Sequence, residues 1–194
     1  MSQPNIVFFF TDDQRFDTIA ALGNDEIITP NIDRLVGMGT TFTQAHIPCG
    51  TSGAVCMPSR AMLMTGRTLF HLEREGQSIP PEHTTMGEVL QQAGYRTFGT
   101  GKWHNGTASY ARSFTDGGEI FFGGMWDHWN VPACDFDPDG DYEDQAKPWI
   151  KDAFHAKDIT TVYADHLTPG KHSTELFGDV SEKFLKEYAS DDPY

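Results

Sequence analysis

Short apolar runs and amphipathic stretches alternate along the first half of the chain. Residues 5–10 form a continuous apolar run that stops at Thr11-Asp12-Asp13, which is typical of a central strand buried on both faces and followed by a polar loop. The same criteria predict helices over about 30–36, 59–65 and 86–93, and strands over about 40–45 and 95–100. This alternation predicts an α/β layered fold whose strand ends carry the chemistry.

Two of these helices have recognisable ends. Thr29-Pro30 has the form of an N-cap followed by a first helical residue. Thr85 and Glu88 fit a capping box, and Gly94 closes that helix. The apolar residues expected to face the core from this helix are Met86, Val89, Leu90 and Ala93.

The second half of the chain has a different pattern. From about residue 113 to 160 it is rich in Gly, Asp, Trp and Pro without a sustained period, which predicts a long irregular insertion at about 105–170. Residues 173–190 return to helical spacing. Another strand should follow such a helix in an α/β domain, so we interpret the 194 residues as the N-terminal part of a larger domain, truncated at the C-terminus.

Composition narrows the choice of partners. Hydrophobic residues make up 38% of the chain, and none of its apolar stretches approaches the roughly 18 residues of a membrane span. The formal net charge of −14 argues against nucleic acid as a partner. An anionic substrate would need a local cation or metal to reverse the overall repulsion.

The start of the chain leaves its localisation open. Residues 1–10 lack the basic region, the long apolar segment and the cleavage site of a secretory signal. This pattern is compatible with a cytoplasmic protein, or with a periplasmic or secreted protein whose signal has been removed.

A longer motif surrounds one of the three cysteines. Cys56-Met57-Pro58-Ser59-Arg60 continues through Leu63, Thr65, Gly66 and Arg67. This run resembles the signature of the formylglycine-dependent sulfatases, in the alkaline-phosphatase-like superfamily. The resemblance implies that a formylglycine-generating enzyme oxidises Cys56, and that the hydrated aldehyde supplies the nucleophile. The alternative for a lone cysteine is a buried structural residue, which the length of the match disfavours.

The resemblance also implies a metal site. Asp12 and Asp13 match the metal-binding pair of the family, with the modified Cys56 as a further ligand. Carboxylate oxygens suit Ca²⁺, with Mg²⁺ as the alternative. Without the resemblance, an adjacent acidic pair is more often a solvated turn.

Three further residues are implied to act on the sulfate. Gly101-Lys102-Trp103-His104 resembles a family segment in which Lys and His contact the modified residue and the sulfate. We expect Lys102 to stabilise negative charge and His104 to take a proton from the diol. Arg60, one helical turn beyond Cys56, is expected to bind the diol.

The resemblance therefore predicts hydrolysis of a carbohydrate or aryl sulfate ester by an α/β/α sandwich with a mostly parallel central sheet. The alternatives are a phosphonate or phosphate monoester hydrolase of the same superfamily, and a non-catalytic relative that binds sulfated glycans. In the family the remaining ligands come later in the chain, so we expect the isolated 194 residues to bind metal poorly. They are also expected to be inactive, which turnover of an aryl sulfate would contradict.

Three features outside the motifs stay open. Asp135 to Gly140 fits the opening of an EF-hand loop, but the twelfth position is Ala146, which favours a solvated acidic loop over a secondary Ca²⁺ site. His128, between Trp126 and Trp129, is a candidate substrate-binding residue or an anchor of its loop. Cys49 and Cys134 remain as a possible disulfide pair.

Overall fold

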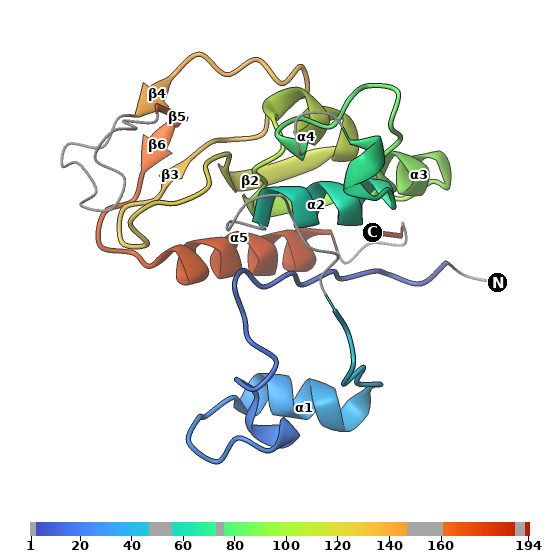
Figure 1. Ribbon diagram of the computed structural model, residues 1–194. Helices are drawn as coiled ribbons and strands as arrows, with labels where there is room; N and C mark the ends of the chain where they lie inside the picture. Colours follow the sequence, from blue (N-terminus) through green and yellow to red (C-terminus); the bar gives the residue numbers. More distant parts are fainter. Residues whose placement is uncertain (1–2, 47–55, 73–75, 147–160, 189–192) are drawn as a thin grey trace. The chain divides into compact units, whose positions relative to one another are not determined.

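The computed structural model describes residues 3–46, 56–72, 76–146, 161–188 and 193–194. The chain divides into two compact units (Figure 1). The smaller unit is Phe8–Cys49, and the larger unit combines Met1–Val7 with Gly50–Tyr194. None of the described helices is long and apolar enough to cross a membrane.

The smaller unit contains the first predicted helix. The 3-10 helix η1 (Ala20–Leu22) precedes α1 (Pro30–Met38), which has Pro30 at its first turn as predicted. The Thr29 hydroxyl joins the two, because it accepts from the Ala20 N–H (2.9 Å) and donates to Asp33 (2.8 Å). The strand expected over 40–45 was wrong: the structure has an exposed turn there, and none of the described strands offers it a ladder partner.

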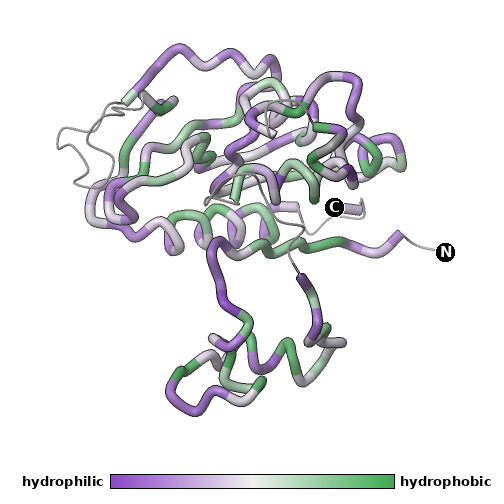
Figure 2. The backbone as a smooth tube through the Cα atoms, in the orientation of Figure 1, coloured by the Kyte–Doolittle hydropathy of each residue, from purple (hydrophilic) through white to green (hydrophobic). Residues whose placement is uncertain are grey.

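The predicted N-terminal strand over residues 5–10 is also absent. Figure 2 shows a hydrophobic stretch here, yet residues 3–10 lie outside every assigned strand and are exposed. The Ile6 N–H does bond the Tyr194 carbonyl at 2.7 Å. A strand needs a continued ladder beside it, and the described residues place none there.

A small parallel sheet forms the centre of the larger unit. Strands β1 (Phe98–Lys102) and β2 (Asp116–Phe121) pair in parallel, and α4 (Thr107–Ser113) connects them. The register shifts between Thr100 and Gly101, where Glu119 of β2 has no opposite partner. The strand predicted over 95–100 is thus confirmed, although it begins three residues later and ends two residues later than predicted.

Helices cover both faces of this sheet (Figure 1). Phe98 stacks on Phe184 of α5 (Ser173–Glu187), with ring centroids 4.2 Å apart. The next residue, Gly99, faces α4, because its carbonyl accepts from the buried Tyr110 hydroxyl at 2.8 Å. The chain is therefore a mixed α/β protein with a small parallel sheet. The larger, mostly parallel sheet expected from the sequence stays a prediction.

In the described part of the larger unit, three helical segments precede the sheet: α2 (Cys56–Thr65), the 3-10 helix η2 (Leu69–His71) and α3 (Met86–Gln92). The capping box of α3 is confirmed, since the Thr85 hydroxyl accepts from the Glu88 N–H and the Glu88 carboxylate accepts from the Thr85 N–H. Its predicted apolar face is wrong, because Val89 is 54% exposed. Instead α3 is buried at Gly87, where it meets α4.

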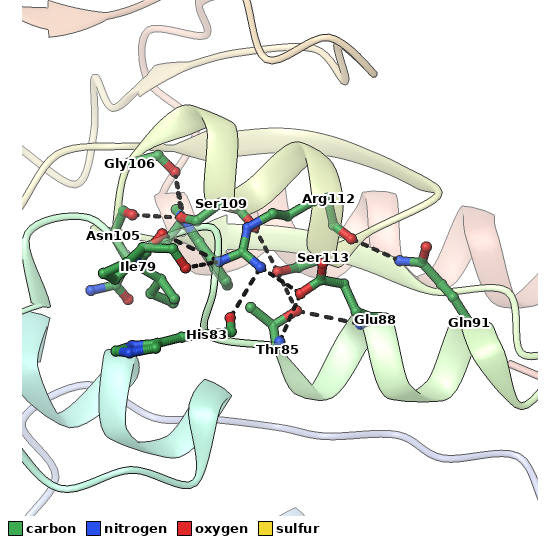
Figure 3. A network of polar contacts seen from close by, with 12 residues as sticks. Ile79, His83, Thr85, Glu88, Gln91, Asn105, Gly106, Ser109, Arg112 and Ser113 are labelled. Atoms are coloured by element: carbon green, nitrogen blue, oxygen red, sulfur yellow. Dashed lines mark hydrogen bonds and ion pairs between the residues drawn. The ribbon is translucent and has the colours of Figure 1, made fainter. Parts of the chain in front are cut away.

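A polar network joins α3, α4 and the loop before α3 (Figure 3). The Arg112 guanidinium pairs with Glu88. It also donates to backbone carbonyls of the loop, at Ile79, Pro80 and His83. The buried Ser113 hydroxyl donates to Thr85 Oγ1 at 2.9 Å. These contacts fix the loop against the two helices.

The segment expected to be irregular, at about 105–170, instead contains regular elements. Besides α4 and β2, its described residues form four two-residue strands, which pair as two antiparallel ladders. They are β3 (Pro132–Ala133) with β6 (His166–Leu167) and β4 (Gln145–Ala146) with β5 (Val162–Tyr163). Strands of two residues are too short to show an alternating pattern, and the glycines of β2 hide its period.

Candidate active site

The start of α2 carries the cysteine of the sequence motif. Cys56 is the first residue of this helix and is half-buried. Arg60, Ala61 and Met64 are buried on the helix and hold it against the core. Because the first N–H groups of a helix lack partners within the helix, this end favours negative charge beside residue 56.

His104 faces Cys56 from the sheet. Its Nδ1 lies 3.5 Å from Cys56 Sγ, within hydrogen-bonding distance for sulfur. His104 follows the end of β1 by two residues and has a φ of 69°, an unusual value for a residue other than glycine. The backbone N–H of the neighbouring Trp103 donates to the Phe121 carbonyl at 2.9 Å, which holds the segment beside the end of β2.

Arg60 connects α2 to the end of β1. Its Nη1 donates to the carbonyl of Lys102, the last residue of β1. Arg60 is 9% exposed, so its charge needs such acceptors to be tolerated. The structure thus brings Cys56, Arg60, Lys102 and His104 together at one end of the sheet. The roles expected for them on the sulfate remain predictions.

Asp12 and Asp13 belong to the smaller unit. Both are exposed, and they lie in a bend where Asp13 has a φ of 49°. Two adjacent carboxylates are hard oxygen donors, which fit Ca²⁺ or Mg²⁺. In the described parts of the chain, His, Cys, Asp and Glu side chains do not gather in groups of three or more suited to a metal.

Asn105 is a site residue that the sequence analysis missed. It is fully buried, and its amide donates to the carbonyl of Met57 at 3.0 Å and to that of Gly76. It therefore ties the first turn of α2 to the segment that carries His104. Its position directly after the Lys102 to His104 motif was the one available signal.

Replacing Asn105 with leucine is expected to lower the free energy of unfolding by roughly 2–3 kcal/mol, because two carbonyls lose a donor. Urea denaturation measures this change. Gln92→Leu makes a comparable amide-to-leucine change at an exposed position of α3 and should stay within about 0.5 kcal/mol of the parent. Equal losses in the two variants would contradict the role given to Asn105.

His128 belongs to the loop between β2 and β3 and contacts the first residue of α5, Ser173. Its Nδ1 is 2.8 Å from the Ser173 hydroxyl, and its ring stacks on His172 with centroids 5.3 Å apart. His172 in turn caps α5, since its Nδ1 accepts from the Thr174 N–H. These contacts support the loop-anchoring interpretation of His128, and its role in substrate binding stays a prediction.

The contacts of the acidic loop at residues 135–140 and of Cys134 indicate structural roles. The Asp137 carboxylate accepts from the N–H groups of Asp139 (2.7 Å) and Gly140 (3.2 Å), so it closes its own turn. Cys134 is fully buried, and burial raises the pKa of its thiol to about 12. Cys49, its possible disulfide partner, lies outside the described residues.

Comparison with known proteins identifies the family of the chain. The model of the sulfatase family matches residues 4–193, so the chain belongs to the sulfatase family. Members of that family generally depend on a formylglycine and on a metal.

Several curated relatives are similar to the chain. It is 36% identical to arylsulfatase H of Canis lupus familiaris over 126 residues, which cover 58% of this chain and 22% of that protein. It is 34% identical to human arylsulfatase G over 157 residues, covering 72% and 29%. With N-acetylgalactosamine-6-O-sulfatase of Bacteroides thetaiotaomicron it shares 36% identity over 113 residues, covering 54% and 22%. The chain thus spans between 22% and 29% of these relatives.

Proposed function

We propose that the complete protein hydrolyses sulfate esters of a carbohydrate or an aryl alcohol, with a formylglycine derived from Cys56 as the nucleophile. The observation that carries this proposal is the 3.5 Å approach of His104 Nδ1 to Cys56 Sγ at the start of α2. Membership of the sulfatase family supports the reaction. The names of the relatives, which include arylsulfatases and a carbohydrate sulfatase, support the substrate class.

The contact between His104 Nδ1 and residue 56 supports a role for His104 in proton transfer. After modification, an oxygen on Cβ of residue 56 replaces the thiol sulfur, and the imidazole Nδ1 is the neighbouring base. One hydroxyl of the hydrated aldehyde attacks sulfur, the ester bond between sulfur and oxygen breaks, and the proton lost by the attacking hydroxyl ends on the departing alcohol. His104 then takes the proton of the second hydroxyl, the carbon–oxygen bond to sulfate breaks, and the aldehyde returns.

The positively charged side chains of Lys102 and Arg60 have different parts in this reaction. Lys102 ends β1, two residues before His104, where its ammonium can offset the negative sulfate. Arg60 has a positioning role, because its guanidinium donates to the Lys102 carbonyl and so holds α2 against the end of β1. We also retain the expectation that Arg60 binds the diol.

We retain the expectation, implied by the family resemblance, that Asp12, Asp13 and the modified residue 56 are ligands of a divalent cation. Such a cation, Ca²⁺ by preference, would polarise the sulfate ester and favour ionisation of the nucleophile. The bound cation would offset the repulsion between an anionic sulfate ester and a protein of net charge −14.

Mass spectrometry of the peptide that contains Cys56 tests the proposal. The complete protein is produced in a host that contains a formylglycine-generating enzyme, and we expect an aldehyde at residue 56. Turnover of the sulfate and the phosphate ester of one phenol is then compared, and the sulfate should be preferred. Preference for phosphate would favour the phosphonate or phosphate hydrolase instead. An unmodified thiol without turnover would favour a glycan-binding relative.

A further inference from the structure

The loop after β2 passes directly beside the ring of His104. A Cβ atom built at Gly124 would lie 2.7 Å from His104 Cε1 and 2.8 Å from Nε2, closer than real Cβ contacts come. It would lie 3.6 Å from Nδ1, the atom that faces Cys56. The loop backbone therefore occupies the space beside one edge of the imidazole, while another ring atom approaches the nucleophile.

The requirement for glycine at this position is steric. The φ of Gly124 lies outside the left-handed region, so alanine could adopt the same φ without the strain of that region. What alanine cannot do is share the space of the His104 ring. A methyl group there would displace either the ring or the loop.

His104 depends on such support from its surroundings. Its φ of 69° is a costly conformation for a residue with a side chain, and it persists only where neighbours hold it. The bond from the Trp103 N–H to the Phe121 carbonyl anchors the backbone just before it. Gly124, three residues after Phe121, limits where the ring can go.

We propose that Gly124 is a positioning residue, whose missing side chain lets the loop hold His104 with Nδ1 directed at residue 56. The inference rests on the proposed function for its catalytic consequence. Its structural content, the contact between Gly124 and His104, does not depend on the reaction. Both parts can therefore be tested separately.

The first test uses the unmodified protein, produced without the formylglycine-generating enzyme. Alkylation of Cys56 by iodoacetamide is followed by peptide mass spectrometry between pH 6 and 9. An imidazole that can take the thiol proton speeds this reaction, so Gly124→Ala should slow it about threefold or more at neutral pH. Gly178→Ala is the matched control, because a Cβ at Gly178 in α5 would meet nothing within 4 Å.

The effect of Gly124→Ala should disappear when His104 is absent. In a His104→Ala background we expect the same alkylation rate with glycine or alanine at position 124. An unchanged rate in the single variant, or an equal fall in both backgrounds, would overturn the proposal. Alkylation does not require sulfatase activity, so these outcomes are independent of the proposed function.

Stability provides a second readout if Gly124→Ala folds poorly. Removing the His104 ring makes room for the methyl group, so the His104→Ala/Gly124→Ala variant should recover most of the Tm lost by the single variant. A double variant as unstable as Gly124→Ala alone would contradict the inferred steric contact between position 124 and the His104 ring. In the modified complete protein, Gly124→Ala should lower kcat for an aryl sulfate about 10- to 100-fold with little change in KM. If Gly124→Ala slows alkylation but leaves kcat unchanged, the contact stands and the catalytic consequence proposed for Gly124 is contradicted.

Discussion

Replacing Cys56 with serine is expected to abolish sulfate-ester turnover, with a loss of roughly 10⁴-fold or more in kcat. Serine at the start of α2 presents one hydroxyl near His104 and forms no aldehyde to be hydrated. If that hydroxyl attacks sulfur, the product is a serine sulfate with no second hydroxyl to expel it. We therefore expect a sulfated residue 56 in Cys56→Ser, detected by mass spectrometry, and none in Cys56→Ala.

Cys134 supplies the control for this experiment. It is fully buried among the residues of the core, and burial raises the pKa of its thiol to about 12, so it stays protonated at working pH. Cys134→Ala should lower stability by about 1 kcal/mol while keeping the activity of the folded fraction. Sustained turnover by Cys56→Ser, or loss of turnover in folded Cys134→Ala, would contradict the assignment of the nucleophile.

The sequence predicted the parts of the site whose signals are local. The helical pattern predicted a helix over about 59–65 that includes Arg60, with Cys56 just before it; α2 is present and begins three residues earlier, at Cys56. The motif that ends in His104 was expected directly after a strand over 95–100; β1 is present but extends two residues further, so that Gly101 and Lys102 lie in the strand. The capping box at Thr85 also involves neighbours within one turn. Each of these features is determined by residues only a few positions apart in the sequence.

Features that depend on distant neighbours were missed. Asn105 acts on Met57, which lies 48 positions earlier, and a sequence gives no sign of which carbonyl a buried amide will meet. Gly124 matters through His104, and a glycine in a loop looks the same whether it faces solvent or a ring. The apolar run at 5–10 has the composition of a strand, yet pairing is decided by neighbours in space.

The helix α3 illustrates how packing can override an apolar pattern. Spacing placed Met86 and Val89 in the core, but these side chains are 37% and 54% exposed. The helix approaches α4 through Gly87 instead, and the Thr85 to Ser113 bond crosses the same contact. Because a glycine has no side chain, a pattern built on hydrophobic residues gives it no weight. The close approach of two backbones was therefore invisible in the sequence.

Alanine at position 87 is expected to cost about 3 kcal/mol or more of the free energy of unfolding, measured by urea denaturation. A Cβ there would lie 1.9 Å from the Ser113 carbonyl oxygen and 2.8 Å from its carbon. These are backbone atoms of α4, so no rotamer change relieves the overlap. The helices must separate, which also strains the Arg112 to Glu88 ion pair and the Ser113 to Thr85 hydrogen bond.

Gly178→Ala tests whether this loss is specific to the contact. Gly178 is also helical, in α5, and a Cβ there meets nothing within 4 Å, so alanine should stabilise the protein by up to about 1 kcal/mol through helix propensity. Opposite signs in the two variants would support a backbone contact between α3 and α4. A Gly87→Ala variant as stable as the parent would contradict it. Since α4 connects β1 to β2, loosening this contact should also disturb the end of β1, where Lys102 precedes His104.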